Sequence, residues 1–272
     1  MVTLIDFVGQ EKAQGPLQER KLEPWLDKIT CMDALEGLKQ LPRGGADLVL
    51  TDPPFNALSN WGQKEGNAPT RLDPAKWFKG DNLPPEEFRE FSFNWLCESK
   101  EILKNTGSLF TFCDWKAYAV FYGCIVDNKY KLGDLLVWYK NSIGLGRIWR
   151  KTFELIIFVT KTDKPAVYDI GKPNTLIFDK ITDNNRKHHP TEKPISLIEA
   201  LITTCTDIGD IVLDPFMGSG TTAVACRRLR RRFIGFEINP EYCKIAEKRL
   251  RKTFPLPLES LRSKQSELKL ED

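Results

Sequence analysis

The sequence predicts an α/β fold built on a doubly wound, mostly parallel β-sheet. The clearest indication is the last third of the chain, where residues 210–214 and 232–237 have the apolar pattern of buried strands. A helical pattern follows each strand, over residues 219–230 and 239–251. Strands that alternate with helices form parallel sheets that bind ligands at the carboxyl ends of the strands. We therefore expect a ligand site just beyond these two strands.

The first two thirds of the chain continue the same alternation. The predicted strand at residues 47–51 ends before two prolines, at 53 and 54, because proline lacks the N–H that a strand ladder needs. The predicted strands are residues 28–31, 47–51, 107–113, 134–139 and 153–160, and the predicted helices are residues 32–40, 86–104, 115–127 and a segment that begins at Pro194.

Two segments depart from this alternation. Residues 56–85 are rich in Gly, Pro, Asn and Trp, and a loop of this length inside a compact domain is usually functional or disordered. Residues 162–189 are polar and predict a linker or small insert. We expect one domain over residues 1–254 and a charged, loosely held tail over residues 255–272.

Composition excludes several classes of protein. The net charge of +3, from 40 Lys and Arg against 37 Asp and Glu, gives no overall basic field that would mark a nucleic-acid protein. The sequence shows neither a secretory signal pattern nor an apolar run long enough to cross a bilayer. Seven cysteines without a CxxC pair, mostly in apolar stretches, are typical of reduced, buried thiols. We therefore expect a cytoplasmic protein without a membrane partner.

A glycine-rich turn is the first functional signal. The segment DPFMGSGTT, residues 214–222, joins a strand to a helix, and Glu237 ends the next strand. Glycines at 218 and 220 let the backbone turn tightly and approach a ligand at a helix N-terminus, and a carboxylate at Glu237 can accept hydrogen bonds from ribose hydroxyls. These features suit S-adenosylmethionine as the ligand. They also suit a dinucleotide, because residues 218–223 satisfy the GxGxxG/A pattern of dinucleotide-binding turns. Packing of helix on sheet is a third interpretation, and the lack of a lysine after the glycines argues against a P-loop.

The segment TDPPF, residues 51–55, is the second signal. Its plain interpretation is a strand stop with Phe55 in the core. Its chemical interpretation is an amino-methylation site, because the Asp52 carboxylate and the Pro53 carbonyl would accept both N–H bonds of an aromatic amine and localise its lone pair. Pro53 and Pro54 stiffen the turn, and Phe55 offers a face for a base removed from the stack. This chemistry needs no metal, since positioning and electrostatics supply the rate.

Together, TDPPF and LDPFMGSGTT resemble the two signature motifs of the amino-group DNA methyltransferases, in the order of the circularly permuted β class. The resemblance covers most of residues 28–251 and implies the Rossmann-like fold of the class I S-adenosylmethionine-dependent methyltransferases. It places an acidic residue near the cofactor adenine, and residues 189–194 look like the family's cofactor-contacting HPTEKP segment. The catalytic residues that it implies are Asp52, Pro53, Pro54 and Phe55. The cofactor-binding residues that it implies are Asp33, His189, Thr191, Lys193, Asp214, Phe216, Gly218, Ser219, Gly220, Thr221 and Glu237.

The resemblance also implies a substrate, double-stranded DNA with a flipped base. We expect methylation of adenine N6, because Asp rather than Ser precedes the prolines; cytosine N4 is the alternative, since some cytosine-modifying members also carry Asp. A restriction–modification system would add a cognate endonuclease as a partner. The family commonly has a larger recognition region than residues 162–189, so target reading is short, shared with the 56–85 loop, or supplied by a second subunit of a homodimer. A nicotinamide-dependent oxidoreductase, a non-catalytic nucleic-acid module, and RNA or protein substrates are the remoter alternatives.

Two basic segments suggest where DNA phosphates would lie. The arginine run at residues 227–232 favours a solvated helix end over DNA contact, because cations stabilise helix C-termini. The glycine-rich turn at residues 142–151 combines Arg147, Arg150 and Lys151 with Trp149, which fits either phosphate contact or a plain hairpin loop.

Overall fold

Eight strands form one mixed, mostly parallel sheet in the computed structural model, which describes residues 21–56, 83–143, 148–179 and 192–261. The strands are β1 (Lys28–Cys31), β2 (Ala46–Thr51), β3 (Leu103–Cys113), β4 (Lys131–Tyr139), β5 (Phe153–Thr160), β6 (Thr175–Ile177), β7 (Ile211–Asp214) and β8 (Arg232–Glu237). Their order across the sheet is β1-β8-β7-β2-β3-β5-β4-β6. Only β5 runs antiparallel to its neighbours β3 and β4, which confirms the predicted sheet.

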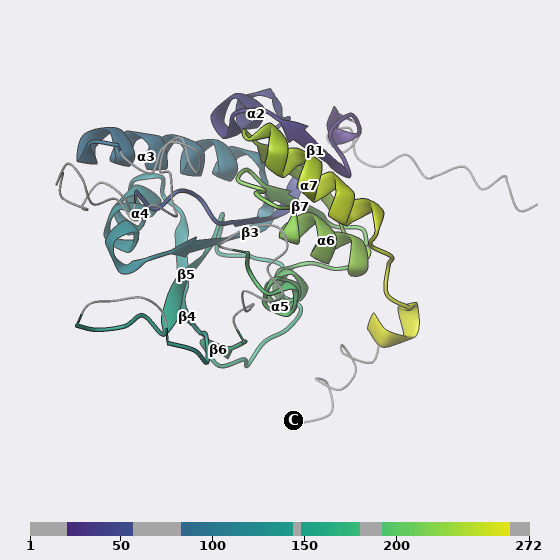
Figure 1. The fold of residues 1–272 in the computed structure, drawn as a ribbon. Helices are drawn as coiled ribbons and strands as arrows, with labels where there is room; N and C mark the ends of the chain where they lie inside the picture. Colours follow the sequence, from purple (N-terminus) through teal and green to yellow (C-terminus); the bar gives the residue numbers. More distant parts are fainter. Residues whose placement is uncertain (1–20, 57–82, 144–147, 180–191, 262–272) are drawn as a thin grey trace, which may run out of the picture.

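Helices cover both faces of the sheet (Figure 1). The helices are α2 (Ala34–Gln40), α3 (Pro85–Ile102), α4 (Trp115–Asp127), α5 (Ile195–Cys205), α6 (Thr221–Arg228) and α7 (Pro240–Arg251). The first three pack into one core and the last three into a second core on the opposite face. Within the described ranges, no helix combines the length and apolar character that crossing a bilayer requires.

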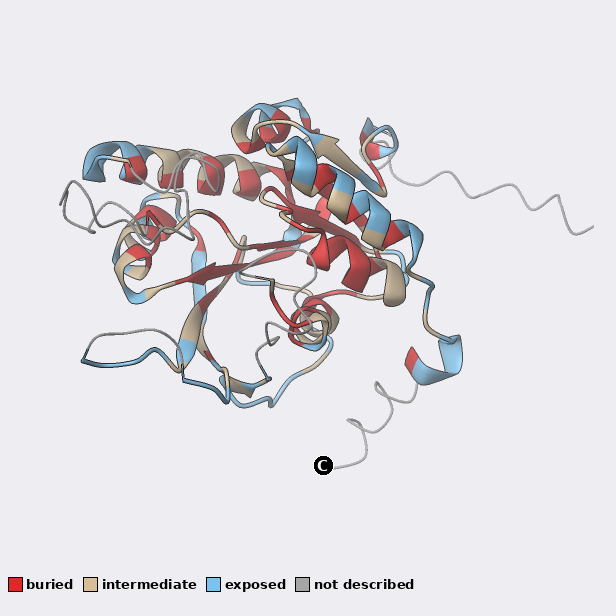
Figure 2. Cartoon of the chain, viewed as in Figure 1, coloured by how far each residue is buried: buried red, intermediate tan, exposed pale blue. Residues whose placement is uncertain are grey.

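Alternate residues of the central strands enter these two cores. Val49 and Leu213 pack with α2, α3 and α4, whereas Leu48, Leu50 and Val212 pack with α5, α6 and α7. The alternation follows from the pleat, which points successive side chains to opposite faces. Figure 2 shows the resulting band of buried residues along the central strands. Burial on both faces explains why the strand sequences are continuously apolar.

A pair of reciprocal hydrogen bonds joins the two ends of the predicted 56–85 loop. The Asn56 side-chain amide donates to the Leu83 carbonyl at 2.8 Å, and the Leu83 N–H donates to the Asn56 Oδ1 at 2.8 Å. Asn56 has a φ of 56°, a left-handed conformation that asparagine tolerates better than most residues. Residues 57–82 of the loop lie outside the described residues.

Two polar segments make contacts with residues far away in the sequence. The polar segment 162–189 contains β6, which pairs with β4 at the sheet edge through Trp138 and Leu176; its last residues, from 180, lie outside the described ranges. In the expected tail, the Leu256 N–H donates to the Arg228 carbonyl at 2.8 Å and Leu261 is buried. Both segments are held by contacts with distant residues, which local polarity does not predict.

Two helical glycines provide a test of the packing. A Cβ at Gly37 in α2 would lie 2.6 Å from the Phe236 ring, whereas a Cβ at Gly123 in α4 would meet no atom within 4 Å. We expect Gly37→Ala to destabilise the protein by about 1–3 kcal/mol through overpacking. Gly123→Ala should stabilise it by about 0.5–1 kcal/mol, because alanine restricts the unfolded chain. Urea denaturation of both variants measures the difference, and equal effects would contradict this packing.

Candidate active site

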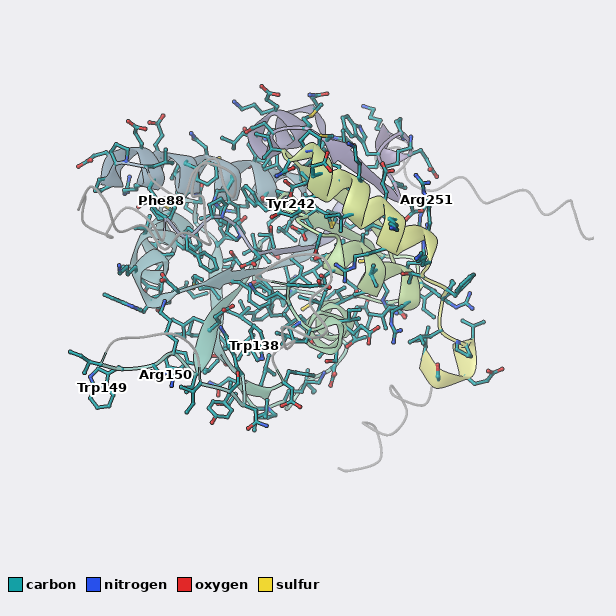
Figure 3. All side chains as sticks on the ribbon, in the orientation of Figure 1. Phe88, Trp138, Trp149, Arg150, Tyr242 and Arg251 are labelled. Atoms are coloured by element: carbon teal, nitrogen blue, oxygen red, sulfur yellow. The ribbon has the colours of Figure 1, made fainter. Side chains whose placement is uncertain are left out.

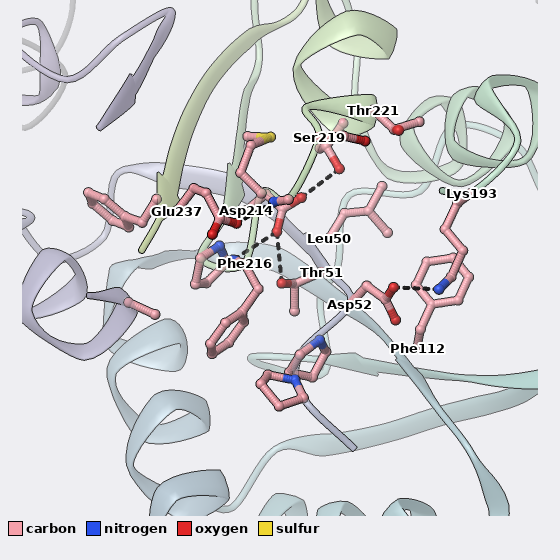
Figure 4. A pocket seen from close by; sticks show the side chains of 18 of the residues that line it. Leu50, Thr51, Asp52, Phe112, Lys193, Asp214, Phe216, Ser219, Thr221 and Glu237 are labelled. Atoms are coloured by element: carbon pink, nitrogen blue, oxygen red, sulfur yellow. Dashed lines mark hydrogen bonds and ion pairs between the residues drawn. The ribbon is translucent and has the colours of Figure 1, made fainter. Parts of the chain in front are cut away.

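The two sequence motifs meet at the carboxyl ends of neighbouring strands. β2 and β7 are paired in parallel through Leu48 with Val212 and Val49 with Leu213, so the segments that follow Thr51 and Asp214 leave the sheet side by side. Between them lies a pocket of about 260 Å³ that both motifs line. Figure 4 shows this pocket, with Thr51 directed toward Asp214 and Lys193 directed toward Asp52. One cavity therefore contains both groups of predicted residues.

The Asp214 carboxylate joins the two motifs. It is buried and accepts hydrogen bonds from the Thr51 hydroxyl at 2.8 Å, the Thr222 hydroxyl at 2.6 Å and the Phe216 N–H at 3.1 Å. Burial raises the pKa of Asp214 to about 6, although its three donors act in the opposite direction. The group is thus a structural anchor that binds the end of β2 to the start of α6.

The glycine turn has the backbone conformation that the sequence predicts. Gly218 and Gly220 have φ values of 54° and 86°, in the left-handed region, and a Cβ at Gly220 would lie 2.7 Å from the Ala246 Cβ. The Glu237 carboxylate accepts 2.8 Å hydrogen bonds from the N–H groups of Gly218 and Asn239, one on each oxygen. Burial raises the pKa of Glu237. Because a carboxylate oxygen has two lone pairs, Glu237 can hold the turn and still accept from a ligand in the pocket.

Asp33 stands at the same end of the pocket. Its Oδ1 caps α2 by accepting from the N–H groups of Leu35 at 2.9 Å and Glu36 at 3.3 Å. The aromatic ring of Phe236 and the side chain of Ile238 line the adjoining wall. This end therefore offers an acceptor beside apolar surface, which suits a purine ring with an amino group.

The opposite end of the pocket is charged. Lys193 is buried, and its ammonium forms an ion pair with Asp52 Oδ2 and lies 3.4 Å from Glu154 Oε2. Burial raises the pKa of Asp52, Lys193 lowers it and Glu154 raises it further. Burial would also lower the pKa of Lys193, but the two carboxylates outweigh this effect and raise it. Lys193 therefore stays cationic beside Asp52.

Arg249 of α7 holds the glycine turn from behind. Its guanidinium donates to the Ser219 carbonyl and hydroxyl, both at 2.8 Å, and to the Thr221 hydroxyl at 3.3 Å. It also forms an ion pair with Glu192, the residue before Lys193. The turn and the segment that enters α5 are thus tied to one side chain.

Most of the sequence-predicted residues line this one pocket. Two exceptions, His189 and Thr191, lie outside the described residues, and Gly220 shapes the turn without lining the pocket. Lys193 lines it at the Asp52 end, not beside Glu237. The predicted residues that line the pocket are Asp33, Asp52, Pro53, Pro54, Phe55, Lys193, Asp214, Phe216, Gly218, Ser219, Thr221 and Glu237.

Sequence analysis did not identify Glu154 and Arg249 as residues of the site. Glu154 is the one charged residue in the apolar strand FELIIFVT, and an isolated charge in a buried strand is a signal that can be read from sequence. Arg249 lies among other cations of α7, so nothing local distinguishes it. Within the described ranges, no three His, Cys, Asp or Glu side chains group so that they could hold a metal ion.

The sheet order and the pocket at its carboxyl edge define a class I S-adenosylmethionine-dependent methyltransferase with a Rossmann-like fold. Solved structures agree. The crystal structure of the M1.HpyAVI-SAM complex has 27% identity and a TM-score of 0.62, covering 82% of this chain and 98% of that chain. PvuII DNA methyltransferase (cytosine-N4-specific), with 22% identity and a TM-score of 0.67 over 88% of this chain and 90% of its own, shares the fold.

Sequence comparison gives the family. Residues 46–248 match the family described as DNA methylase, the N6/N4 amino-methyltransferases. Type II methyltransferase M.HpaI of Haemophilus parainfluenzae is 30% identical over 84% of this chain and 75% of its own. Type II methyltransferase M2.DpnII of Streptococcus pneumoniae is 33% identical over 80% of this chain and 87% of its own. The chain belongs to the DNA methylase family and is an S-adenosylmethionine-dependent DNA methyltransferase, which confirms the predicted class, cofactor and activity.

Titration of Asp214 tests its burial. Its folded pKa of about 6 lies above the ordinary value of 3.8, so between these values the folded protein holds a proton that the unfolded chain has released. The stabilisation is complete below about pH 4 and is lost as the pH rises through about 6. We expect the free energy of unfolding of the wild type, minus that of Asp214→Asn, to fall by about 2–3 kcal/mol across this range. Urea denaturation at several pH values measures this difference. A difference that does not change with pH would contradict the raised pKa of buried Asp214.

Proposed function

We propose that this DNA methyltransferase methylates adenine N6 of a base flipped out of double-stranded DNA. The supporting observation is the state of Asp52 at the pocket. Its Oδ2 is engaged by Lys193, whereas Oδ1 is buried and has no hydrogen-bond partner among the described residues. An unpaired buried carboxylate oxygen is costly unless a ligand donates to it. An amino N–H of the target base is such a donor.

The catalytic residues act by orienting the amine. Asp52 Oδ1 and the Pro53 carbonyl accept the two N–H bonds, which draws the nitrogen toward tetrahedral geometry and localises its lone pair. Pro53 and Pro54 restrict the backbone, and the Phe55 ring, partly buried against both cores, gives the flipped base a surface. As the nitrogen pair forms the new N–C bond, one N–H proton is released to Asp52 Oδ1 and then to water. Burial raises the pKa of Asp52 and so favours this proton transfer.

The other end of the pocket suits the cofactor. S-adenosylmethionine, when bound, supplies a methyl group attached to a positively charged sulfur, and loss of this methyl group leaves a neutral thioether. Glu237 accepts the ribose hydroxyls, and Asp33 and Phe236 hold the adenine. Gly218 has no side chain to shield its backbone from a ligand. A Cβ added there would have no protein atom within 4 Å, so the space beside it is open. The remaining cofactor-binding residues that we propose are His189, Thr191, Asp214, Phe216, Ser219, Gly220 and Thr221. Lys193, for which the resemblance implies cofactor contact, pairs with Asp52 at the other end of the pocket.

The target base follows from the residue before the prolines. Asp52 supplies a charged acceptor, and Asp at this position favours adenine in the family that the chain resembles. Cytosine N4 carries an amine of the same geometry and is the alternative product. Nucleoside analysis separates the two, because N6-methyladenine and N4-methylcytosine have different masses.

The DNA partner is proposed to contact the connection between β4 and β5. Trp149 and Arg150 lie on this connection, which projects away from the sheet (Figure 3). The Trp149 side chain is 89% exposed and Ile148 82% exposed, an unusual placement for large apolar groups unless a partner covers them. The Lys151 ammonium next to them forms a long ion pair with Asp114, at 3.4 Å. Aromatic and cationic side chains together suit bases and phosphates.

The biological setting completes the proposal. We place the catalytic domain at residues 1–254, with residues 162–189 and the 56–85 loop reading the target sequence. The enzyme would act on cytoplasmic DNA. A cognate restriction endonuclease in the same cell would be its partner, and a homodimer would let a second subunit share target recognition.

Asp52→Ala tests the chemistry. We expect methyl transfer from radiolabelled S-adenosylmethionine to unmethylated DNA to fall by at least about 1,000-fold, because the charged acceptor at the amine is lost. The affinity for S-adenosylmethionine in calorimetry should stay within about threefold. Asp127→Ala, which removes an exposed ion pair with Arg89 at the surface, is the matched control and should keep full activity. An active Asp52→Ala enzyme would refute the role of Asp52.

Glu237→Gln tests the cofactor end. The change removes the charge that accepts the ribose hydroxyls and should raise the dissociation constant for S-adenosylmethionine about 10- to 100-fold. Glu241→Gln, at the exposed start of α7 where the carboxylate pairs with Lys244, should leave this dissociation constant unchanged. Calorimetry with both variants measures the effect. Equal affinities would place the ribose elsewhere.

A further inference from the structure

Four buried or partly buried charges of alternating sign form a row of ion pairs, and Asp52 is the last of them. Lys140, the residue after β4, forms an ion pair with Glu154 of β5. Glu154 Oε2 lies 3.4 Å from the Lys193 ammonium, which in turn forms an ion pair with Asp52 Oδ2. The four groups come from four different segments of the chain, so the fold, not one local motif, brings them together.

The Lys193 side chain contacts two carboxylates and an aromatic ring. Its ammonium donates a hydrogen bond to Asp52 Oδ2, forms a longer ion pair with Glu154 Oε2 at 3.4 Å, and lies 4.9 Å from the centroid of the Phe112 ring, a favourable cation–π distance. Its neighbour Glu192 is paired with Arg249, which also donates to Ser219 in the glycine turn. The position of the ammonium is therefore coupled to the cofactor turn on one side and to Asp52 on the other.

The ion pair makes the two oxygens of Asp52 unequal. Oδ2 is occupied by Lys193, which fixes the rotation of the carboxylate. Oδ1 is buried, unpaired among the described residues, and belongs to a residue that lines the pocket. A carboxylate without this partner would be free to rotate, and in a buried position beside Glu154 it would take up a proton more readily.

We propose that Lys193 is a positioning residue for methyl transfer, which holds Asp52 by Oδ2 and keeps it ionised so that Oδ1 meets the amino group of the target base. Glu154, held by Lys140, sets the strength of this effect, because it attracts Lys193 while repelling negative charge on Asp52. The inference rests on the proposed role of Asp52 in the reaction. It gives Lys193 a place at the base, not at the cofactor.

A purely structural ion pair makes a different prediction. Replacing Lys193 alone would leave the Asp52 charge without its partner and would destabilise the fold, but the effect on the methyl-transfer rate would then not depend on pH. A positioning role predicts that the acid limb of the pH–rate profile shifts along the pH axis. The charged and titratable groups that act on Asp52 or that it acts on are Lys193, Glu154, Lys140, Asp214 and Cys113.

The test measures single-turnover methyl transfer to DNA against pH in three variants. Lys193→Met should move the acid limb upward by about 1–3 pH units, so that activity at neutral pH falls about 10-fold or more and recovers in alkali. Glu154→Gln removes the neighbouring negative charge and should move the limb downward. Lys193→Arg keeps the cation and should leave the limb close to that of the wild type. The affinity for S-adenosylmethionine should stay within about threefold in all three.

The outcomes separate this inference from the proposed function. An unshifted limb in Lys193→Met, or an upward shift in Glu154→Gln, overturns the positioning role while an inactive Asp52→Ala enzyme still supports the chemistry. An active Asp52→Ala enzyme instead removes the proposed function itself. Thermal melts establish that each variant is folded, and if Lys193→Met does not fold, the direction of the Glu154→Gln shift decides.

Discussion

The active site depends on one buried carboxylate. Asp214 ends β7 and accepts from Thr51 at the end of β2, from Thr222 in the first turn of α6 and from the backbone of the turn between them. Since a buried carboxylate needs hydrogen bonds to offset the loss of water, these donors cannot move independently. The segment that carries Asp52 and the glycine turn are consequently fixed with respect to each other.

Other acidic groups of the pocket are also held by hydrogen bonds from the protein. Asp33 caps a helix and Glu237 braces the glycine turn, and both remain on the pocket wall. Their orientation is set by backbone N–H groups before a ligand arrives, so binding does not have to order them. The cations are treated likewise, since Arg249 and Lys193 are held by contacts on more than one side. The pocket is therefore organised by its protein neighbours.

Sequence reasoning succeeded where local pattern decides the outcome. The strands Phe153–Thr160 and Arg232–Glu237 and the helix Trp115–Asp127 have the predicted bounds, because apolar periodicity and caps act over a few residues. The two motifs at Asp52 and Gly218 were found because glycine and proline restrict backbone in ways that sequence displays.

It failed where a distant partner decides. The three-residue strand β6 exists because β4 offers an unpaired edge, and the place of Lys193 depends on Glu154, which lies 39 positions earlier in the chain. The arginine run was expected to be a solvated helix end. Arg231 is instead buried and donates to the Thr206 and Leu229 carbonyls, and Arg228 pairs with Glu199. Local charge indicates that a residue is polar but does not identify the group that it binds.

The amide pair between Asn56 and Leu83 has a consequence for how such an enzyme can diversify. Its two hydrogen bonds close the frame around Asp52 at the point where the intervening 26 residues, 57–82, leave and return. A segment of another length or sequence can be accommodated between these two anchors without moving the backbone at Asp52. Under the role in target reading proposed for this loop, the recognised DNA sequence can change while the residues that carry the chemistry stay in place.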